Sequence, residues 1–158
     1  MKEFSHLDAH NNPAMVDVGG KAITHRTAHA RSRVVLNADI MNRLENSDIQ
    51  TPKGPVFQTA IIAGTMAAKR TDELIPLCHS LGLDSCKLSV ATEGHDVIID
   101  CFTSTEARTG VEMEALVGAS VAALTVYDMC KAFSHDIVIQ DTRLIAKTGG
   151  KQDFHTQG

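Results

Sequence analysis

The sequence has no tryptophan, and aromatic residues make up only 4% of it, so large rings do not fill most of its core. Alanine, valine, isoleucine and leucine must fill it instead, and we expect tight contacts between helices and a sheet. No uninterrupted run approaches the roughly 18 apolar residues that span a membrane. The N-terminus has no apolar segment typical of a secretory signal. These absences predict a cytoplasmic protein with no membrane partner.

The four cysteines form no C-x-x-C pair, and a chain of 158 residues is large enough to fold without disulfides. We therefore expect reduced thiols. Cys78 and His79 are adjacent, which is not the spacing of zinc ligands, so no metal site is predicted. The formal net charge of -4 argues against a nucleic-acid partner, since non-specific nucleic-acid binders are usually basic.

The length of 158 residues predicts a single domain over residues 1–158. Alternation with a period of two residues predicts strands, and spacings near 3.6 residues predict helices. Strands are predicted at 21–36, 81–92, 96–104 and 136–147, helices at about 37–45, 55–70 and 112–132, and a hairpin turn at 93–96. Residues 1–20 are expected to form an N-terminal arm, residues 46–54 a loop, and residues 148–158 a flexible C-terminal tail.

Without the short first helix, this order is βαβ-βαβ, which is the ferredoxin-like order. We therefore predict an α+β fold with an antiparallel four-stranded sheet and helices on one face. Ile98 beside Ile99 puts apolar side chains on both faces of one strand, which favours covering of the second face by another subunit. Arg26 is the one charge on the small-residue face of the first strand, and an inward-facing arginine needs an anionic partner.

Several cations stand beside glycine, threonine or apolar residues rather than in mixed surface charge, which suggests a local anion site. They are Lys53, Lys69, Arg70, Arg108, Lys131, Lys147 and Lys151. The Gly-Gly turn between Lys147 and Lys151 can expose backbone N–H groups to an anion, although it is not a P-loop. Thr109 and Gly110 precede a long helix, whose N-terminus also favours anions.

Asp128 and Lys131 are three residues apart near the end of the helix at 112–132, so they share a face. They are either a plain salt bridge or an acid and a base. Ser120 and Leu124 continue the same stripe of a helix that should pack in the core, so we expect the pair to line a cleft. The residues alone thus predict an enzyme-like protein with an anion site and an Asp–Lys pair.

Segments along most of the chain resemble, in the same order, signatures of the cyclic pyranopterin monophosphate synthase family of molybdenum cofactor biosynthesis. They are Met15–Val18, Lys53–Gly54, Ala67–Thr71, Leu74–His79, Thr109–Leu116, Ser120–Leu124, Tyr127–Lys131 and Lys147–Lys151. One departure is Ser80, which stands where the family pattern has proline and is expected to loosen the loop that holds His79.

The resemblance implies a lyase that converts a cyclised 7,8-dihydroguanosine triphosphate into cyclic pyranopterin monophosphate and diphosphate, without a redox cofactor. It also implies a homohexamer, a trimer of dimers with sites between subunits, and Asp128 and Lys131 as the catalytic pair. The implied substrate-binding residues are Leu77, Cys78, His79, Met113, Glu114, Lys53, Arg26, Glu112, Lys147 and Lys151.

Two other classes of protein remain open at this point. A non-catalytic nucleotide-binding regulator of ferredoxin-like fold would explain the anion site, and a non-catalytic assembly subunit would need only the apolar faces. Neither class assigns a role to Asp128 and Lys131, and neither class explains Arg26 or the clustered lysines.

Overall fold

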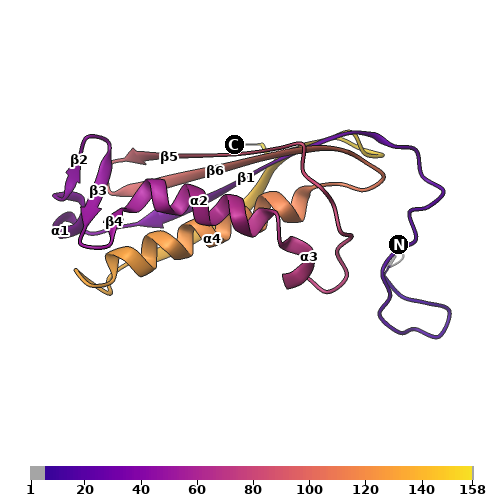
Figure 1. The fold of residues 1–158 in the computed structure, drawn as a ribbon, viewed down its shortest axis with the longest axis horizontal. Helices are drawn as coiled ribbons and strands as arrows, with labels where there is room; N and C mark the ends of the chain where they lie inside the picture. Colours follow the sequence, from indigo (N-terminus) through magenta and orange to yellow (C-terminus); the bar gives the residue numbers. More distant parts are fainter. Residues whose placement is uncertain (1–5, 158) are drawn as a thin grey trace.

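The fold is an antiparallel sheet with two long helices packed along one of its faces (Figure 1). The computed structural model describes residues 6–157, so residues 1–5 of the predicted arm and residue 158 of the predicted tail lie outside the described residues. The elements are β1 (Thr24–Val35), α1 (Ala38–Met41), β2 (Leu44–Glu45), β3 (Asp48–Thr51), β4 (Gly54–Pro55), α2 (Val56–Ala68), α3 (Thr71–Leu74), β5 (Ser85–Glu93), β6 (Asp96–Ala107), α4 (Glu112–Cys130), β7 (Val138–Thr148) and β8 (Phe154–His155).

The main sheet has the strand order β5-β6-β1-β7-β8, and all neighbouring strands are antiparallel. The predicted α+β class is confirmed, and the order of the first four of these strands is consistent with a ferredoxin-like fold. The prediction of four strands is wrong, because the sheet has five. The fifth, β8, pairs Phe154 and His155 with the end of β7, and a two-residue strand is too short to show alternation.

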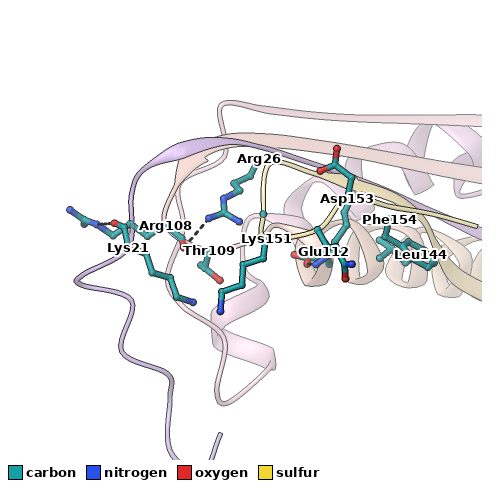
Figure 2. Close-up of a pocket in the computed structure, with 13 residues that line it drawn as sticks. Lys21, Arg26, Arg108, Thr109, Glu112, Leu144, Lys151, Asp153 and Phe154 are labelled. Atoms are coloured by element: carbon teal, nitrogen blue, oxygen red, sulfur yellow. Dashed lines mark hydrogen bonds and ion pairs between the residues drawn. The ribbon is translucent and has the colours of Figure 1, made fainter. Parts of the chain in front are cut away.

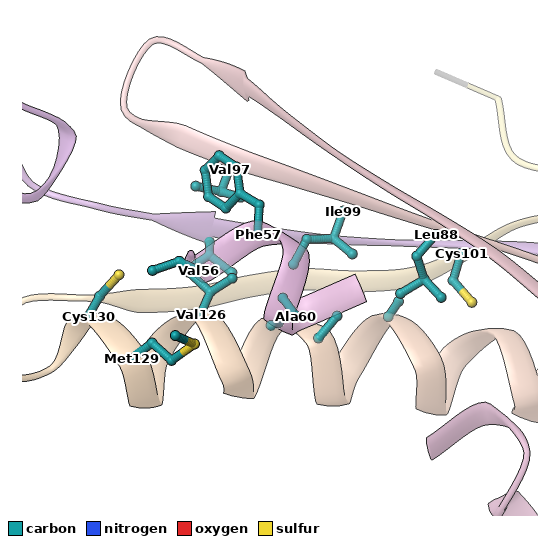
Figure 3. Packing of buried hydrophobic residues seen from close by; sticks show 14 of the residues in the cluster. Val56, Phe57, Ala60, Leu88, Val97, Ile99, Cys101, Val126, Met129 and Cys130 are labelled. Atoms are coloured by element: carbon teal, nitrogen blue, oxygen red, sulfur yellow. The ribbon is translucent and has the colours of Figure 1, made fainter. Parts of the chain in front are cut away.

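The core lies between the sheet and the helices α2 and α4, which pack against each other (Figure 3). Small residues let the two helices approach closely. A Cβ atom at Gly64 of α2 would lie only 2.7 Å from the carbonyl oxygen of Gly118 in α4, and 3.1 Å from the Cβ atom of Ala122. The expected tight contacts therefore depend on glycine where the helices cross.

The strands β2, β3 and β4 form a small second sheet. β3 lies in the predicted loop at 46–54, whereas β2 lies at the end of the predicted helix at 37–45, which stops at Met41. The role of this sheet is to cap α2, which has no side-chain cap of its own. The buried carboxylate of Asp48 in β3 accepts hydrogen bonds from the backbone N–H groups of Phe57 at 2.7 Å and Gln58 at 3.1 Å. This carboxylate at the positive end of a helix dipole fixes where α2 begins.

The sheet face away from the helices carries ion pairs rather than an apolar surface. Arg31 donates to both carboxylate oxygens of Asp100, at 2.8 and 3.0 Å, and Nε2 of His29 lies 2.6 Å from the same carboxylate. Burial acts to raise the pKa of Asp100, but hydrogen bonds from Arg31 and His29 outweigh it, and the pKa is lowered. Ile98 is buried on this face, and covering of the face by another subunit stays a prediction.

The outward faces of α2 and α4 are apolar instead. α2 contains no charged residue, and α4 has none between Glu114 and Asp128. Ile62, Met66 and Leu124 are 62%, 49% and 57% exposed. By length and composition α4 is apolar enough to cross a membrane, and its charged residues lie near its two ends. Because 56% of this stretch is buried in the fold, α4 has the position of a core helix.

Candidate functional site

Two adjoining hollows lie at the N-terminal end of α4, and both are bordered by Lys21, Thr109, Gly110, Glu112, Lys147 and Lys151. The first, the cationic hollow, has a volume of about 540 Å³ and is further lined by Arg26, Arg108, Leu144, Gly150, Gln152, Asp153 and Phe154. The second, the His79 hollow, has a volume of about 580 Å³ and is further lined by His6, Val16, Val18, Leu77, Cys78, His79, Leu81, Met113 and Glu114. Together they bring most of the sequence-predicted site residues to one cavity.

The cationic hollow has an excess of positive charge. Its cations are Lys21, Arg26, Arg108, Lys147 and Lys151, and its carboxylates are Glu112 and Asp153. In the view of Figure 2, the side-chain ends of Lys21 and Lys151 both lie below the guanidinium of Arg26. Cations that converge in a hollow raise the local concentration of anions and can bind phosphate oxygens by charge-assisted hydrogen bonds.

Arg26 reaches this hollow from β1, but the anionic partner expected for it is not a carboxylate of residues 6–157. Its Nε and Nη2 atoms donate to the carbonyl oxygens of Ala107 and Arg108, at 3.4 and 3.2 Å. Main-chain carbonyls orient the guanidinium without neutralising it. The positive charge of Arg26 is therefore available to a ligand.

The strand end that carries Lys147 is fixed by close contacts. Lys147 donates from Nζ to Oε1 of Glu112 at 2.8 Å, which joins β7 to the first turn of α4. Gly149 has a φ of 90°, and a Cβ atom there would collide with the carbonyl group of His25. Glycine is thus required at this turn, which directs Lys147 and Lys151 to the same hollow.

His79 is tied to the N-terminal arm, because its Nε2 atom lies 2.6 Å from the carbonyl oxygen of Val16. A carbonyl oxygen only accepts, so Nε2 carries the hydrogen. In the neutral ring, Nδ1 is then the acceptor. The next residue, Ser80, donates its hydroxyl to the carboxylate of Asp72 in α3. This hydrogen bond holds the loop that the absence of proline was expected to loosen.

Glu114 is only 4% exposed and borders the His79 hollow. Burial raises the pKa of its carboxyl group, and the nearby charge of Glu112 raises it further. Burial likewise raises the pKa of the Cys78 thiol. Both shifts favour the neutral, protonated form, so this wall of the cavity can donate a proton or a hydrogen bond to a ligand.

Asp128 and Lys131 lie at the opposite end of α4 from the cavity. Lys131 donates to Oδ1 of Asp128 at 2.8 Å, and Nζ of Lys53 lies 3.8 Å from Oδ2. The hydrogen bond lowers the pKa of Asp128 and raises that of Lys131. Their side chains are 56% and 46% exposed. About 24 Å of helix separates Asp128 from Glu112, so the expectation that the pair lines a cleft is wrong for the single chain.

Sequence reasoning missed Lys21, which lines the cationic hollow, and named Arg108 only among the cations that suggest a local anion site. Lys21 lies where the arm joins β1, and only the fold shows that this junction meets the end of β7. Arg108 did carry a signal, since it is a cation directly before the Thr109–Gly110 helix start. Among residues 6–157, no group of three or more His, Cys, Asp or Glu side chains is arranged to hold a metal ion.

Comparisons with known proteins agree on one family. Residues 15–150 match the MoaC family. A protein of Xanthomonas oryzae pv. oryzae named cyclic pyranopterin monophosphate synthase is 55% identical over 152 residues, covering 96% of this chain and 92% of its own. A protein of the same name from Desulforapulum autotrophicum is 48% identical over 153 residues, covering 96% and 93%.

A longer relative contains the same region as part of a larger protein. Molybdenum cofactor biosynthesis protein 1 of Dictyostelium discoideum is 46% identical over 167 residues, covering 94% of this chain and 26% of its own. These matches confirm the resemblance seen in the sequence segments. Because the family match spans most of the length of this chain, the chain belongs to the MoaC family.

Proposed function

We propose that this chain is a cyclic pyranopterin monophosphate synthase. It converts (8S)-3′,8-cyclo-7,8-dihydroguanosine 5′-triphosphate into cyclic pyranopterin monophosphate and diphosphate, within molybdenum cofactor biosynthesis. One observation carries the proposal: a cationic wall adjoins a hollow that holds a histidine, His79, and a buried carboxyl group, Glu114. Family membership and the names of the relatives support the same activity.

The triphosphate suits the cationic hollow. Lys21, Arg26 and Lys151 offer charge-assisted hydrogen bonds to its oxygens. The first turn of α4 has no side-chain cap at Val111, so its N–H groups remain available to an anion. A substrate hydroxyl attacks the α-phosphorus, the bond from that phosphorus to the diphosphate oxygen breaks, and the cations stabilise the departing charge. The step consumes no water, so the enzyme is of the phosphorus–oxygen lyase type.

The purine end suits the His79 hollow, where ring opening and re-closure need protons to move. A protonated Glu114 is a suitable donor, and Nδ1 of a neutral His79 is a suitable acceptor. Leu77, Cys78 and Met113 supply the surrounding wall. The atoms of the substrate are redistributed between the two products without a change in overall oxidation level. The proposed reaction therefore needs no redox cofactor.

The catalytic pair requires a second chain. Asp128 lies about 24 Å along α4 from Glu112 at the cavity of its own chain. Lys131 and Lys53 lie beside Asp128. All three reach substrate only if a cavity of another copy lies beside them. We therefore infer a homo-oligomer with sites between subunits, a hexamer built as a trimer of dimers. The free thiols of all four cysteines suit an enzyme that works in the cytoplasm.

The direct test is turnover by the purified protein. The cyclised nucleotide is added, diphosphate release is measured, and the pterin is detected by fluorescence after oxidation. We expect both products in equal amounts, and none from GTP, which lacks the C3′–C8 bond. Binding of the cyclised nucleotide without either product would contradict the proposal and favour a nucleotide-binding regulator of ferredoxin-like fold.

A further inference from the structure

Cys86 lies at the edge of the main sheet, in a hollow that the proposed reaction does not use. Its strand, β5, is an outermost strand of the sheet, and the end of α2 packs beside it. This hollow, which we call the Cys86 hollow, has a volume of about 480 Å³ and is lined by Thr65, Lys69 and residues 81–86. Sites for small molecules have volumes of roughly 300–1,000 Å³. The hollow therefore has room for a small ligand beside the sulfur of Cys86.

A second thiol, that of Cys101, lies next to Cys86. In the register of β5 and β6, Cys86 is opposite Thr103 and Leu88 is opposite Cys101, so the two cysteines are diagonal neighbours on one face of the sheet. Cys101 is completely buried, whereas Cys86 is half-buried. A hydrogen bond joins the two side chains. The buried thiol can thus donate its hydrogen to a thiolate at Cys86.

The surroundings of Cys86 favour the thiolate over the thiol. The hydrogen bond with Cys101 lowers the pKa of Cys86, burial opposes this, and the charge of Lys69 lowers the pKa further. The same hydrogen bond and burial raise the pKa of Cys101, which keeps that sulfur protonated. Because the thiolate is the nucleophilic form, Cys86 is the reactive sulfur of the pair.

Cys78 offers a comparison within the same chain, because it is half-buried like Cys86. Its neighbours are carboxyl groups, and its pKa is raised by burial and by Glu114. Cys130 is buried, and burial raises its pKa to about 11. Of the four cysteines, all of which lie within residues 6–157, Cys86 alone combines access from a hollow with a stabilised thiolate.

We propose that Cys86 is a site of reversible oxidation, which reacts first with a hydroperoxide and then with a small anionic thiol of the glutathione class. In the first step, the thiolate sulfur attacks one oxygen of hydrogen peroxide, the O–O bond breaks, and hydroxide leaves. The product is a sulfenic acid, in which the sulfur has lost the two electrons that the peroxide gained.

In the second step, the thiolate of the small molecule attacks the oxidised sulfur. An S–S bond forms, the S–O bond breaks, and the leaving hydroxide takes up a proton to give water. A further molecule of the small thiol attacks the mixed disulfide by thiol–disulfide exchange, which releases the small disulfide and restores the Cys86 thiolate.

Cys101 is not placed to take the part of the small thiol. Diagonal neighbours across an antiparallel pair are about 7–8 Å apart, whereas the Cα atoms of a disulfide are usually about 4.4–6.8 Å apart. Cys101 is also enclosed by α4, since a Cβ atom at Gly118 would lie 2.7 Å from its sulfur. A thiol that enters from the hollow meets neither obstacle.

Lys69 gives the Cys86 hollow a preference for an anionic thiol. The lysines that form ion pairs with carboxylates among residues 6–157 are Lys53, Lys131 and Lys147. The ammonium group of Lys69 is therefore available to a carboxylate of the incoming molecule. Glutathione carries two carboxylates beside its thiol, so it suits a hollow that holds one cation and one reactive sulfur.

An adduct in the Cys86 hollow would also affect the neighbouring cavity. Leu81 lines both the Cys86 hollow and the His79 hollow, and only Ser80 separates it from His79 in the chain. A bound tripeptide would press on residues 81–84 and displace Leu81 from the wall of the His79 hollow. Modification should therefore lower turnover. This consequence rests on the proposed function, whereas the reactivity of Cys86 does not.

Trapping of the sulfenic acid tests the first step. The wild-type protein is treated with hydrogen peroxide in the presence of dimedone, a diketone that captures sulfenic acids. Proteolytic cleavage before Asp84 puts Cys78 and Cys86 on separate peptides for mass spectrometry. We expect Cys86 to be captured at least about five times as fast as Cys78, since the rate follows the thiolate fraction. Capture of Cys78 at an equal or higher rate would overturn the proposal.

Substitutions of the neighbours test why Cys86 reacts. Cys101→Ala removes the hydrogen-bond donor and should slow capture of Cys86 at least about threefold, whereas Cys101→Ser keeps a donor and should slow it less. Because Cys101 is buried, Lys69→Met provides a second measurement at an exposed position, with an expected slowing of about twofold. Wild-type capture rates in both Cys101→Ala and Lys69→Met would overturn the proposed activation.

Peroxide followed by glutathione tests the second step and its consequence. We expect one glutathione on each chain, at Cys86, and its removal by dithiothreitol. A Cys86–Cys101 disulfide in place of the adduct would overturn the second step. The modified protein should lose most of its turnover, and Cys86→Ser taken through the same treatment should keep its own.

The outcomes for turnover separate the two proposals. Undiminished turnover by the modified protein would overturn the link between the two hollows and leave the proposed function standing. No turnover by the unmodified wild-type protein would overturn the proposed function, and the capture rates would still decide whether Cys86 is the reactive thiol.

Discussion

The imidazole of His79 holds the main chain of Val16, with 2.6 Å between Nε2 and the carbonyl oxygen. This contact joins the cavity to an arm that lies far from it in sequence. The arm in turn contributes Val16, Val18 and Lys21 to the cavity wall. His79 therefore fixes both its own ring and the segment that borders the site.

We expect the neutral ring of His79 to carry its hydrogen on Nε2, because Val16 offers only an acceptor. Nitrogen-15 chemical shifts of the imidazole, assigned by comparison with His79→Gln, report which nitrogen is protonated. A neutral ring protonated on Nδ1 would contradict the hydrogen bond to the arm and the acceptor role proposed for Nδ1.

Asp128→Asn and Lys131→Ala should each lower kcat by at least about a hundredfold, if the pair transfers protons in catalysis. As exposed side chains on a helix end, they contribute little to folding. The thermal unfolding temperature of both variants should therefore stay close to that of the wild type. Near-normal turnover by either folded variant would reduce the pair to a surface salt bridge.

Glu114→Gln should change the pH dependence of stability. Burial raises the pKa of Glu114 above its ordinary 4.5, so protonation favours the folded state. That contribution is fully present below pH 4.5 and is lost as the pH rises through the folded-state pKa. Glutamine stays neutral, so the variant's free energy of unfolding relative to wild type should increase with pH over this window.

Urea denaturation at a series of pH values measures this difference. A difference between Glu114→Gln and wild type that does not vary with pH would show that the carboxyl is not held in its neutral form. Turnover should fall in the same variant, because glutamine has no proton to donate.

Lys147→Ala should weaken binding of the triphosphate, since Lys147 is a cation of the cationic hollow. Hydrogen bonds to charged groups contribute about 1.5–3 kcal/mol, which corresponds to at least about a tenfold rise in KM. Lys87→Ala is the matched control, because Lys87 is exposed on β5 and lines neither hollow. Equal KM values for the two variants would remove Lys147 from the phosphate site.

Gly64→Ala should destabilise the fold, although alanine is ordinarily the better helix former. The new Cβ atom would lie 2.7 Å from the carbonyl oxygen of Gly118, and overpacking of this kind costs about 1–3 kcal/mol. Gly82→Ala is the control, because nothing lies within 4 Å of its added Cβ. If chemical denaturation finds the Gly64→Ala variant as stable as the wild type, then α2 and α4 can move apart without loss of stability.

The sequence was sufficient to predict each helix or strand that has a clear periodic pattern of its own. The long strands and both long helices have clear patterns, and the Asn37 cap of α1 is local, since its side chain accepts from Ile40 three residues on. The cap of α2 was not predictable in this way. It comes from Asp48, which reaches Phe57 only because β3 folds back toward the helix.

The candidate site also has a part that the sequence predicted and a part that depends on the whole fold. Segments that resemble the family's signatures identified most of the cavity wall, but the position of Asp128 relative to that wall depends on the whole length of α4. A pattern of residues indicates that Asp128 and Lys131 share a face, and it does not indicate whether that face meets solvent or another chain. The fold adds that both side chains are exposed in the single chain.

The helix α4 also fixes the distance and the angle between residues at its two ends. It sets the span between Met113 and Asp128 by a count of residues, with about 1.5 Å and 100° for each one. Inserting a single residue within this span would turn the carboxylate of Asp128 by more than a quarter of a circle, and no loop lies between them to absorb the change. The middle of α4 should therefore not tolerate the insertion of a single residue.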